Sequence, residues 1–148
     1  MAFLLTIDAS VFVAACRAEE PGFSSARHLL AALRKSGTPL IEPALLPVET
    51  AAALRRAGLP AQDALEYALS IASLPRLTVV PLDLPLMQRS AQLAVENALR
   101  GADAIYAAVS ELFGATLVTL DQEQLRRSPA TIEACTPEAA RRLLLKGT

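Results

Sequence analysis

Four acidic residues stand in segments of the sequence that are otherwise almost wholly apolar. They are Asp8 in LLTIDASVFVAAC, Glu49 in LPVETAAAL, Asp103 in LRGADAIYAAVS and Asp121 directly after ATLVTL. A carboxylate inside a protein core is costly unless a positive group pairs with it. Each acid also has a purely structural explanation, because the helix dipole stabilises a carboxylate near a helix N-terminus. Taken singly, each residue is therefore either a helix cap or a ligand.

Taken together, the four acids favour a bound divalent cation. Carboxylates a few ångströms apart repel one another and cannot all ionise cheaply. A divalent cation removes that cost, and a set of oxygen ligands suits Mg²⁺ or Mn²⁺. Zinc is a poor candidate, because the chain contains one histidine and two distant cysteines. We therefore expect a magnesium or manganese site.

The segments around these acids indicate an α/β fold with a parallel sheet. Short apolar runs, each suited to a buried strand, alternate with helical segments. We expect strands over residues 3–7, 39–42, 77–82, 115–120 and 131–135. We expect helices over residues 8–18, 21–35, 43–57, 61–74, 83–99, 102–113, 122–127 and 137–145, with Asp83 as a helix cap.

This arrangement places two of the acids at strand ends. Asp8 follows the first expected strand, and Asp121 follows the fourth. In open parallel sheets, sites form beyond the carboxyl ends of strands, where the strand order reverses. If the first and fourth strands are neighbours, Asp8 and Asp121 face the same crevice.

The composition indicates one globular domain, which we expect over residues 1–148. Hydrophobic residues make up 53% of the chain and charged residues 20%, which argues against disorder. The net charge of −1 gives no general attraction to nucleic acid. Binding a polyanion would require bound cations or local arginines, for which Arg100, Arg126 and Arg127 are candidates.

Targeting signals and cysteines point to a cytoplasmic protein. The N-terminus lacks the basic start of a signal peptide, and no apolar run reaches the length of about 18 residues that a membrane span needs. Cys16 and Cys135 are isolated and fit a reducing compartment. We therefore expect a soluble cytoplasmic protein that does not associate with a membrane.

At the four acids the sequence resembles the PIN-domain ribonucleases, and most closely the VapC-type toxins of bacterial toxin–antitoxin pairs. The resemblance covers the chain from Asp8 to the expected strand at 131–135. Its most specific part is RGADAIYAA followed by TLD about 18 residues later. The segments that carry it are IDAS at 7–10, PVETAAAL around Glu49, RGADAIYAA at 100–108 and VTLDQEQL at 118–125.

The resemblance implies a three-layer α/β/α sandwich with a central parallel sheet of four to five strands. It also implies an endoribonuclease that depends on Mg²⁺ or Mn²⁺, the toxin of a type II toxin–antitoxin pair. The expected partners are an RNA substrate, a cognate antitoxin and a second copy of the chain. Segments 44–57 and 61–74, rich in alanine and leucine, are candidate surfaces for dimerisation or for an antitoxin peptide.

The resemblance also assigns the site residues. Asp8, Glu49, Asp103 and Asp121 match the four acids of the family, and Ser10 and Thr119 match hydroxyl positions that support the first and last acids. We expect Asp8 and Asp103 to hold the principal cation. Asp121 and Glu49 would hold a second ion or orient the attacking water.

Other functions fit the sequence less well. The chain could be a PIN-domain nuclease of RNA processing rather than a toxin, or a catalytically silent binding module. A more distant alternative is a Mg²⁺-binding phospho-acceptor domain, similar to a response-regulator receiver. That family needs a late lysine at a strand end, whereas the only lysines here are Lys35 and Lys146 and neither closes an expected strand.

Overall fold

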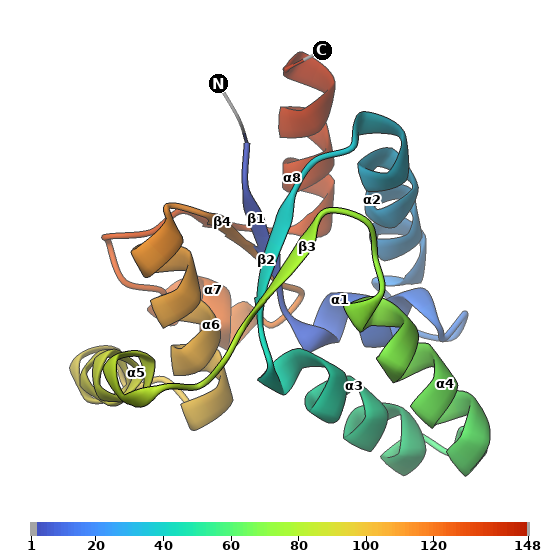
Figure 1. Cartoon of the computed structure of the whole chain (residues 1–148). Coiled ribbons are helices and arrows are strands. Elements are labelled where there is room, and N and C mark those ends of the chain that lie inside the picture. Colours follow the sequence, from blue (N-terminus) through green and yellow to red (C-terminus); the bar gives the residue numbers. More distant parts are fainter. Residues whose placement is uncertain (1–2, 148) are drawn as a thin grey trace.

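The computed structural model describes residues 3–147, in which strands and helices follow one another in the expected order (Figure 1). The strands are β1 (Leu5–Ile7), β2 (Leu40–Pro43), β3 (Leu77–Val80), β4 (Thr116–Val118) and β5 (Ala134–Cys135). The helices are α1 (Ala9–Ala15), α2 (Phe23–Ser36), α3 (Leu45–Arg56), α4 (Ala61–Ala72), α5 (Leu84–Asn97), α6 (Gly101–Phe113), α7 (Gln122–Arg127) and α8 (Pro137–Lys146).

The strands form one parallel sheet in the order β3-β2-β1-β4-β5. In β1, Leu5 pairs with Leu40 of β2 on one side and with Thr116 of β4 on the other. The chain therefore builds the sheet outward from β1 in one direction and then crosses back to build it in the other. The switch of direction lies between β1 and β4, so the condition that makes Asp8 and Asp121 neighbours is confirmed.

Helices cover both faces of the sheet, which confirms the α/β/α arrangement. Figure 1 shows α5 and α6 on one side of the sheet and α1, α2 and α8 on the other. Helix α3 packs against α1, and α4 packs against α3. Two apolar clusters fill the spaces between these layers. One gathers residues of α1, α2 and α8 around β1, and the other gathers residues of α5 and α6.

Four of the strands are shorter than expected, whereas β2 has the expected length and is shifted by one residue. β3 ends at Val80 because Pro81 has no N–H to continue the ladder. β4 ends at Val118, and Thr119 after it turns its hydroxyl toward Asp8. Asp83 caps α5 as expected, by accepting a hydrogen bond from the N–H of Leu86 at 3.0 Å.

The cysteines and the helix lengths agree with the sequence analysis. The thiols of Cys16 and Cys135 are both free. Within residues 3–147, no helix has the length and apolar character that crossing a bilayer requires.

Candidate active site

All four predicted acids line a single cavity of about 490 Å³. Asp8 is the N-cap of α1, Asp121 is the N-cap of α7, and Asp103 lies in the first turn of α6. Glu49 comes from α3, which follows β2. The helices α1, α3 and α6 begin at the same end of the sheet (Figure 1), so residues far apart in the sequence meet beyond the carboxyl ends of β1 and β4.

Asp8 is the most buried of the four acids, and hydroxyl groups hold its carboxylate. Its Oδ1 accepts hydrogen bonds from the N–H and the hydroxyl of Ser10. Its Oδ2 accepts from the hydroxyl of Thr119 at 2.6 Å. These hydroxyls in turn accept from the N–H groups of Leu120 and Asp121, both at 3.0 Å. The chain leaving β4 is thereby tied to Asp8, and both oxygens of the carboxylate are oriented.

Burial raises the pKa of Asp8 to about 7. The hydrogen bonds from Ser10 and Thr119 oppose this rise, and the nearby carboxyls of Asp103 and Glu49 add to it. Near neutral pH, Asp8 is therefore divided between its protonated and ionised forms. A cation bound beside it would favour the ionised form.

Arg100, the residue before α6, bridges two of the acids. Its Nε donates to Oδ2 of Asp103 at 3.1 Å, and its Nη2 donates to Oδ2 of Asp121. The other oxygen of Asp121 caps α7 by accepting from the N–H groups of Glu123 and Gln124. Burial raises the pKa of Asp103, and Arg100 opposes that rise. One guanidinium therefore neutralises part of the charge of the cavity.

Glu49 is half-buried, and burial raises its pKa. Its carboxyl lies near the buried hydroxyl of Tyr106, although the geometry falls short of a hydrogen bond. Burial raises the pKa of Tyr106, and the carboxyls of Glu49, Glu42 and Asp8 raise it further. Tyr106 is thus a core residue whose polar end faces the acids, rather than a platform for stacking RNA bases.

A fifth acid, Glu42 in β2, is fully buried and is not among the four acids predicted from the sequence. Its Oε1 accepts from the N–H of Ile7 at 2.6 Å, where a strand partner would otherwise stand, and its Oε2 has no partner in the structure. Burial raises the pKa of Glu42 well above its usual value, and Asp8 adds to the rise. The sequence signal was the same as that of Asp8, an acid ending a short apolar strand.

The donor set of the cavity suits a hard divalent cation. Its described lining contains four carboxylates and neither a histidine nor a cysteine. Within residues 3–147, however, no three such side chains are already gathered closely enough to hold an ion. Arg100 stands between Asp103 and Asp121, so binding requires carboxylates or the guanidinium to rotate.

Similarity to known proteins was found at the levels of family and fold. Residues 5–128 match the family described as PIN domain. A crystal structure of PAE2754 from Pyrobaculum aerophilum is similar with a TM-score of 0.70 and 26% identity, covering 99% of each chain. None of the proteins with curated functions matches this sequence significantly.

Toxins are among the solved structures with the same fold. Mycobacterium tuberculosis VapC20, described as a toxin that cleaves the sarcin–ricin loop, has a TM-score of 0.71 and 18% identity over 87% of this chain and 98% of its own. VapBC2 from Rickettsia felis, solved with a DNA fragment from its promoter, has a TM-score of 0.68 and 15% identity over 90% and 98%. At these identities the likeness establishes the fold.

Proposed function

Because the chain belongs to the PIN-domain family, whose members are nucleases, we propose that it is a metal-dependent endoribonuclease, a single PIN-like domain over residues 1–148. It would hydrolyse phosphodiester bonds of RNA with Mg²⁺ or Mn²⁺. The observation that carries the proposal is the meeting of Asp8, Glu49, Asp103 and Asp121 in one cavity. Each acid alone could serve as a helix cap or first-turn residue, but carboxylates that share one cavity repel one another, and a bound divalent cation would offset that repulsion.

Each residue has a proposed role that follows from its surroundings. Asp8 and Asp103 hold the principal cation, while Asp121 and Glu49 hold a second ion or orient the attacking water. A divalent cation would supply the activated water and would stabilise charge on the phosphate. Ser10 and Thr119 fix the rotamer of Asp8 through hydrogen bonds to both of its oxygens.

The proposal is tested by RNA cleavage with added Mn²⁺ and then with EDTA. We expect the wild type to cleave only with the metal, and Asp8→Asn to be inactive in both conditions. Asp83→Asn is the matched control, because Asp83 is also an N-cap but lies outside the cavity. Cleavage that survives EDTA, or an active Asp8→Asn variant, would rule out this mechanism.

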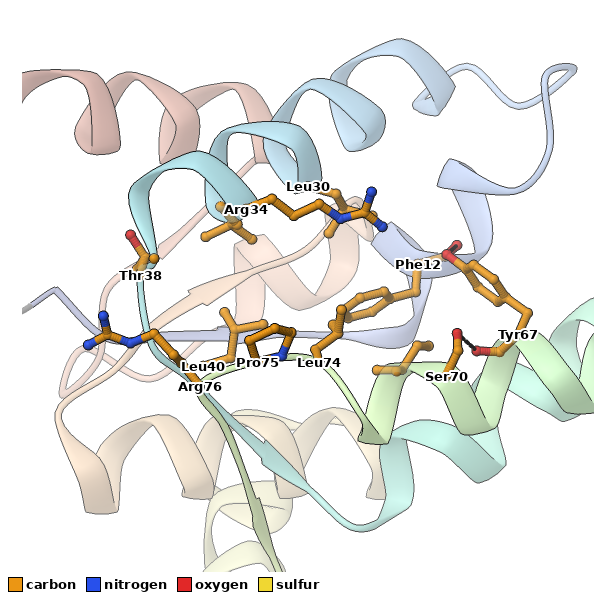
Figure 2. A pocket seen from close by; sticks show the side chains of 13 residues that line it. Phe12, Leu30, Arg34, Thr38, Leu40, Tyr67, Ser70, Leu74, Pro75 and Arg76 are labelled. Carbon is orange, nitrogen blue, oxygen red and sulfur yellow. Dashed lines mark hydrogen bonds between the residues drawn. The ribbon is translucent and has the colours of Figure 1, made fainter.

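We further propose that the nuclease is the toxin of a type II pair and that an antitoxin binds between α2 and α4. Solved structures with this fold include a toxin–antitoxin complex from Klebsiella pneumoniae. The chain has an apolar pocket of about 200 Å³, with Phe12, Leu30 and Leu74 among its lining residues (Figure 2). That volume suits one large apolar side chain of a partner.

The charges around this pocket indicate the chemistry of the partner. Arg34 and Arg76 both line the pocket (Figure 2) and are exposed. Neither forms an ion pair with any residue between 3 and 147. We therefore propose that the antitoxin presents an apolar side chain flanked by carboxylates.

To test the partner proposal, the locus is sequenced and a small protein encoded beside the gene is co-expressed with this chain. We expect it to co-purify with this chain and to dissociate when Arg34 and Arg76 are both changed to glutamate. Arg141→Glu, on α8 and away from the pocket, serves as the charge control. A complex unaffected by the double reversal would contradict the assignment of this surface.

The homodimer also stays a proposal, supported by an apolar strip at the edge of the sheet. Val79 on the edge strand β3 and Leu82, Leu84 and Met87 after it are each more than 40% exposed. Contiguous apolar surface of this kind is typical of protein–protein contacts. Light scattering should report a dimer for the wild type and a monomer for Leu84→Glu. A wild type that is monomeric at micromolar concentration would refute it.

A further inference from the structure

Arg100 is the only cationic side chain between residues 3 and 147 that forms an ion pair with any of the four acids. It contacts acids from two elements, Asp103 on α6 and Asp121 before α7. Its side chain is 68% exposed, so it is not locked into the core. The two ion pairs of Arg100 therefore occupy carboxylates of the cavity but contribute little to the stability of the fold, because exposed ion pairs are weak.

The oxygens that Arg100 occupies are those a cation would need. At Asp121, Oδ1 is committed to capping α7, so Oδ2 is the oxygen free to face the cavity. Arg100 donates to that Oδ2 and to Oδ2 of Asp103. A guanidinium and a divalent cation repel each other, so both cannot sit between the same two carboxylates at low cost.

We propose that Arg100 is an internal counter-ion that competes with the divalent cation for Asp103 and Asp121, and so sets the cation concentration at which the site fills. The inference rests on the proposed function, because it requires the four acids to bind a cation. Without a cation, Arg100 relieves the repulsion between Asp103 and Asp121. With one, Arg100 must leave both carboxylates.

Arg56 provides a matched control within the same cavity. It lines the cavity and is exposed, as Arg100 is, but it forms no ion pair with a residue of the described chain, 3–147. Changing either arginine to glutamine removes one positive charge from the cavity. Only Arg100→Gln also removes a group that contacts the expected ligands. Comparing the two variants therefore distinguishes direct competition for the carboxylates from a general change in the charge of the cavity.

The experiment is calorimetric titration of Mn²⁺ into the wild type, Arg100→Gln and Arg56→Gln at one salt concentration. We expect Arg100→Gln to bind Mn²⁺ roughly tenfold more tightly than the wild type, which corresponds to the loss of two modest ion pairs. We expect Arg56→Gln to change the affinity by less than about threefold, because solvent screens its charge. Arg100→Lys should fall between, since lysine keeps the charge but cannot fork between two carboxylates.

A spectroscopic readout follows the guanidinium itself. In the wild type, the Nε–H resonance of Arg100, identified by its absence in Arg100→Lys, should carry the signature of its hydrogen bond to Asp103. Titration with Mg²⁺ should move this resonance toward that of a solvated arginine, at the Mg²⁺ concentration where the site fills. A resonance that does not change as the site fills would overturn the proposal.

The outcomes separate this inference from the function on which it rests. If neither the wild type nor Arg100→Gln binds Mn²⁺, the metal-dependent function is wrong. If all three proteins bind and the two glutamine variants gain equally, the function stands and the competition is wrong. Weaker binding by Arg100→Gln would also overturn it, because Arg100 would then be organising the acids for the cation.

Discussion

The acidic cavity and the apolar pocket use arginine in opposite ways. In the cavity, Arg100 is paired with Asp103 and Asp121, so its charge is satisfied inside the molecule. At the pocket, Arg34 and Arg76 stand beside apolar side chains and have no ion-pair partner within residues 3–147. This difference fits both proposals, in which a divalent cation takes the place of Arg100 in the cavity and Arg34 and Arg76 pair with carboxylates of a partner.

The two regions lie at different ends of the sheet and share helix α1. The cavity lies beyond the carboxyl ends of β1 and β4, whereas the pocket is lined by residues that precede β2 and β3. Asp8 caps α1 at the cavity, and Phe12 of the same helix lines the pocket. The hydroxyl of Tyr67 donates to the carbonyl of Phe12 at 2.9 Å. Because the two regions lie at different ends of the sheet, we predict that they act independently although both contact α1.

The largest expected effect is that a variant of the cavity impairs only RNA cleavage and a variant of the pocket impairs only antitoxin binding. Asp103→Asn should lower RNA cleavage by more than about 100-fold, because groups that only support a metal ligand already contribute about 10–100-fold. The same variant should bind the antitoxin as the wild type does. The Arg34→Glu, Arg76→Glu double variant should cleave RNA normally and lose the antitoxin. If either variant impaired both activities, the two regions would not be separate sites.

The second effect concerns the free-energy cost of burying the carboxylate of Asp8. In EDTA at pH 8, Asp8→Asn should be more thermostable than the wild type, because it removes a buried carboxylate that lacks a cation. The expected rise in Tm is about 2–4 °C, the change that about 1 kcal/mol causes in a domain of this size. Differential scanning calorimetry measures it. A lower Tm would mean that the hydrogen bonds to Ser10 and Thr119 outweigh the burial cost.

The third effect is the pH dependence of stability without metal. Burial raises the pKa of Glu42 and Asp8 in the folded state, so the folded protein binds more protons than the unfolded chain. Stability should therefore fall as the pH rises above about 4, continuing through about 7 as Asp8 ionises. Glu42→Gln should reduce the difference in Tm between pH 5 and pH 8. An unchanged difference would show that Glu42 is already ionised in the fold.

The smallest effect tests the link between the two regions through α1. Tyr67→Phe removes the hydrogen bond to Phe12 and should lower stability by about 1 kcal/mol. Cleavage should change by less than about twofold, since Asp8 keeps its own hydrogen bonds. Thermal unfolding and the cleavage rate are measured on the same preparation. A strong loss of cleavage would show that α1 couples the pocket to the cavity.

The fold could be predicted from sequence because its signals are local. Short apolar runs bounded by turns identified five strands, and the family resemblance supplied their layers. The adjacency of β1 and β4 could be stated only as a condition, because the pairing of strands distant in sequence leaves no local signal. The expected strands ran too far at their ends: β3 stops before Pro81, and β4 stops before Thr119, whose hydroxyl donates to Asp8.

The candidate site could be predicted in its residue types but not in its contacts. The sequence identified Asp8, Asp103 and Asp121 because each interrupts an apolar stretch. It did not show that Arg100 bridges two of them, since an exposed arginine before a helix ordinarily faces water. Glu42 was also not predicted, although it too ends an apolar run, and its contact with the N–H of Ile7 is visible only in the fold. Such contacts depend on side-chain geometry, which residue order alone does not determine.

Anomalous diffraction from crystals soaked in Mn²⁺ tests the central claim most directly. The account predicts a peak in the cavity, bound to Asp8 and Asp103, with the guanidinium of Arg100 turned away from Asp103 and Asp121. A cavity without a peak at saturating Mn²⁺, with Arg100 still on both carboxylates, would contradict it.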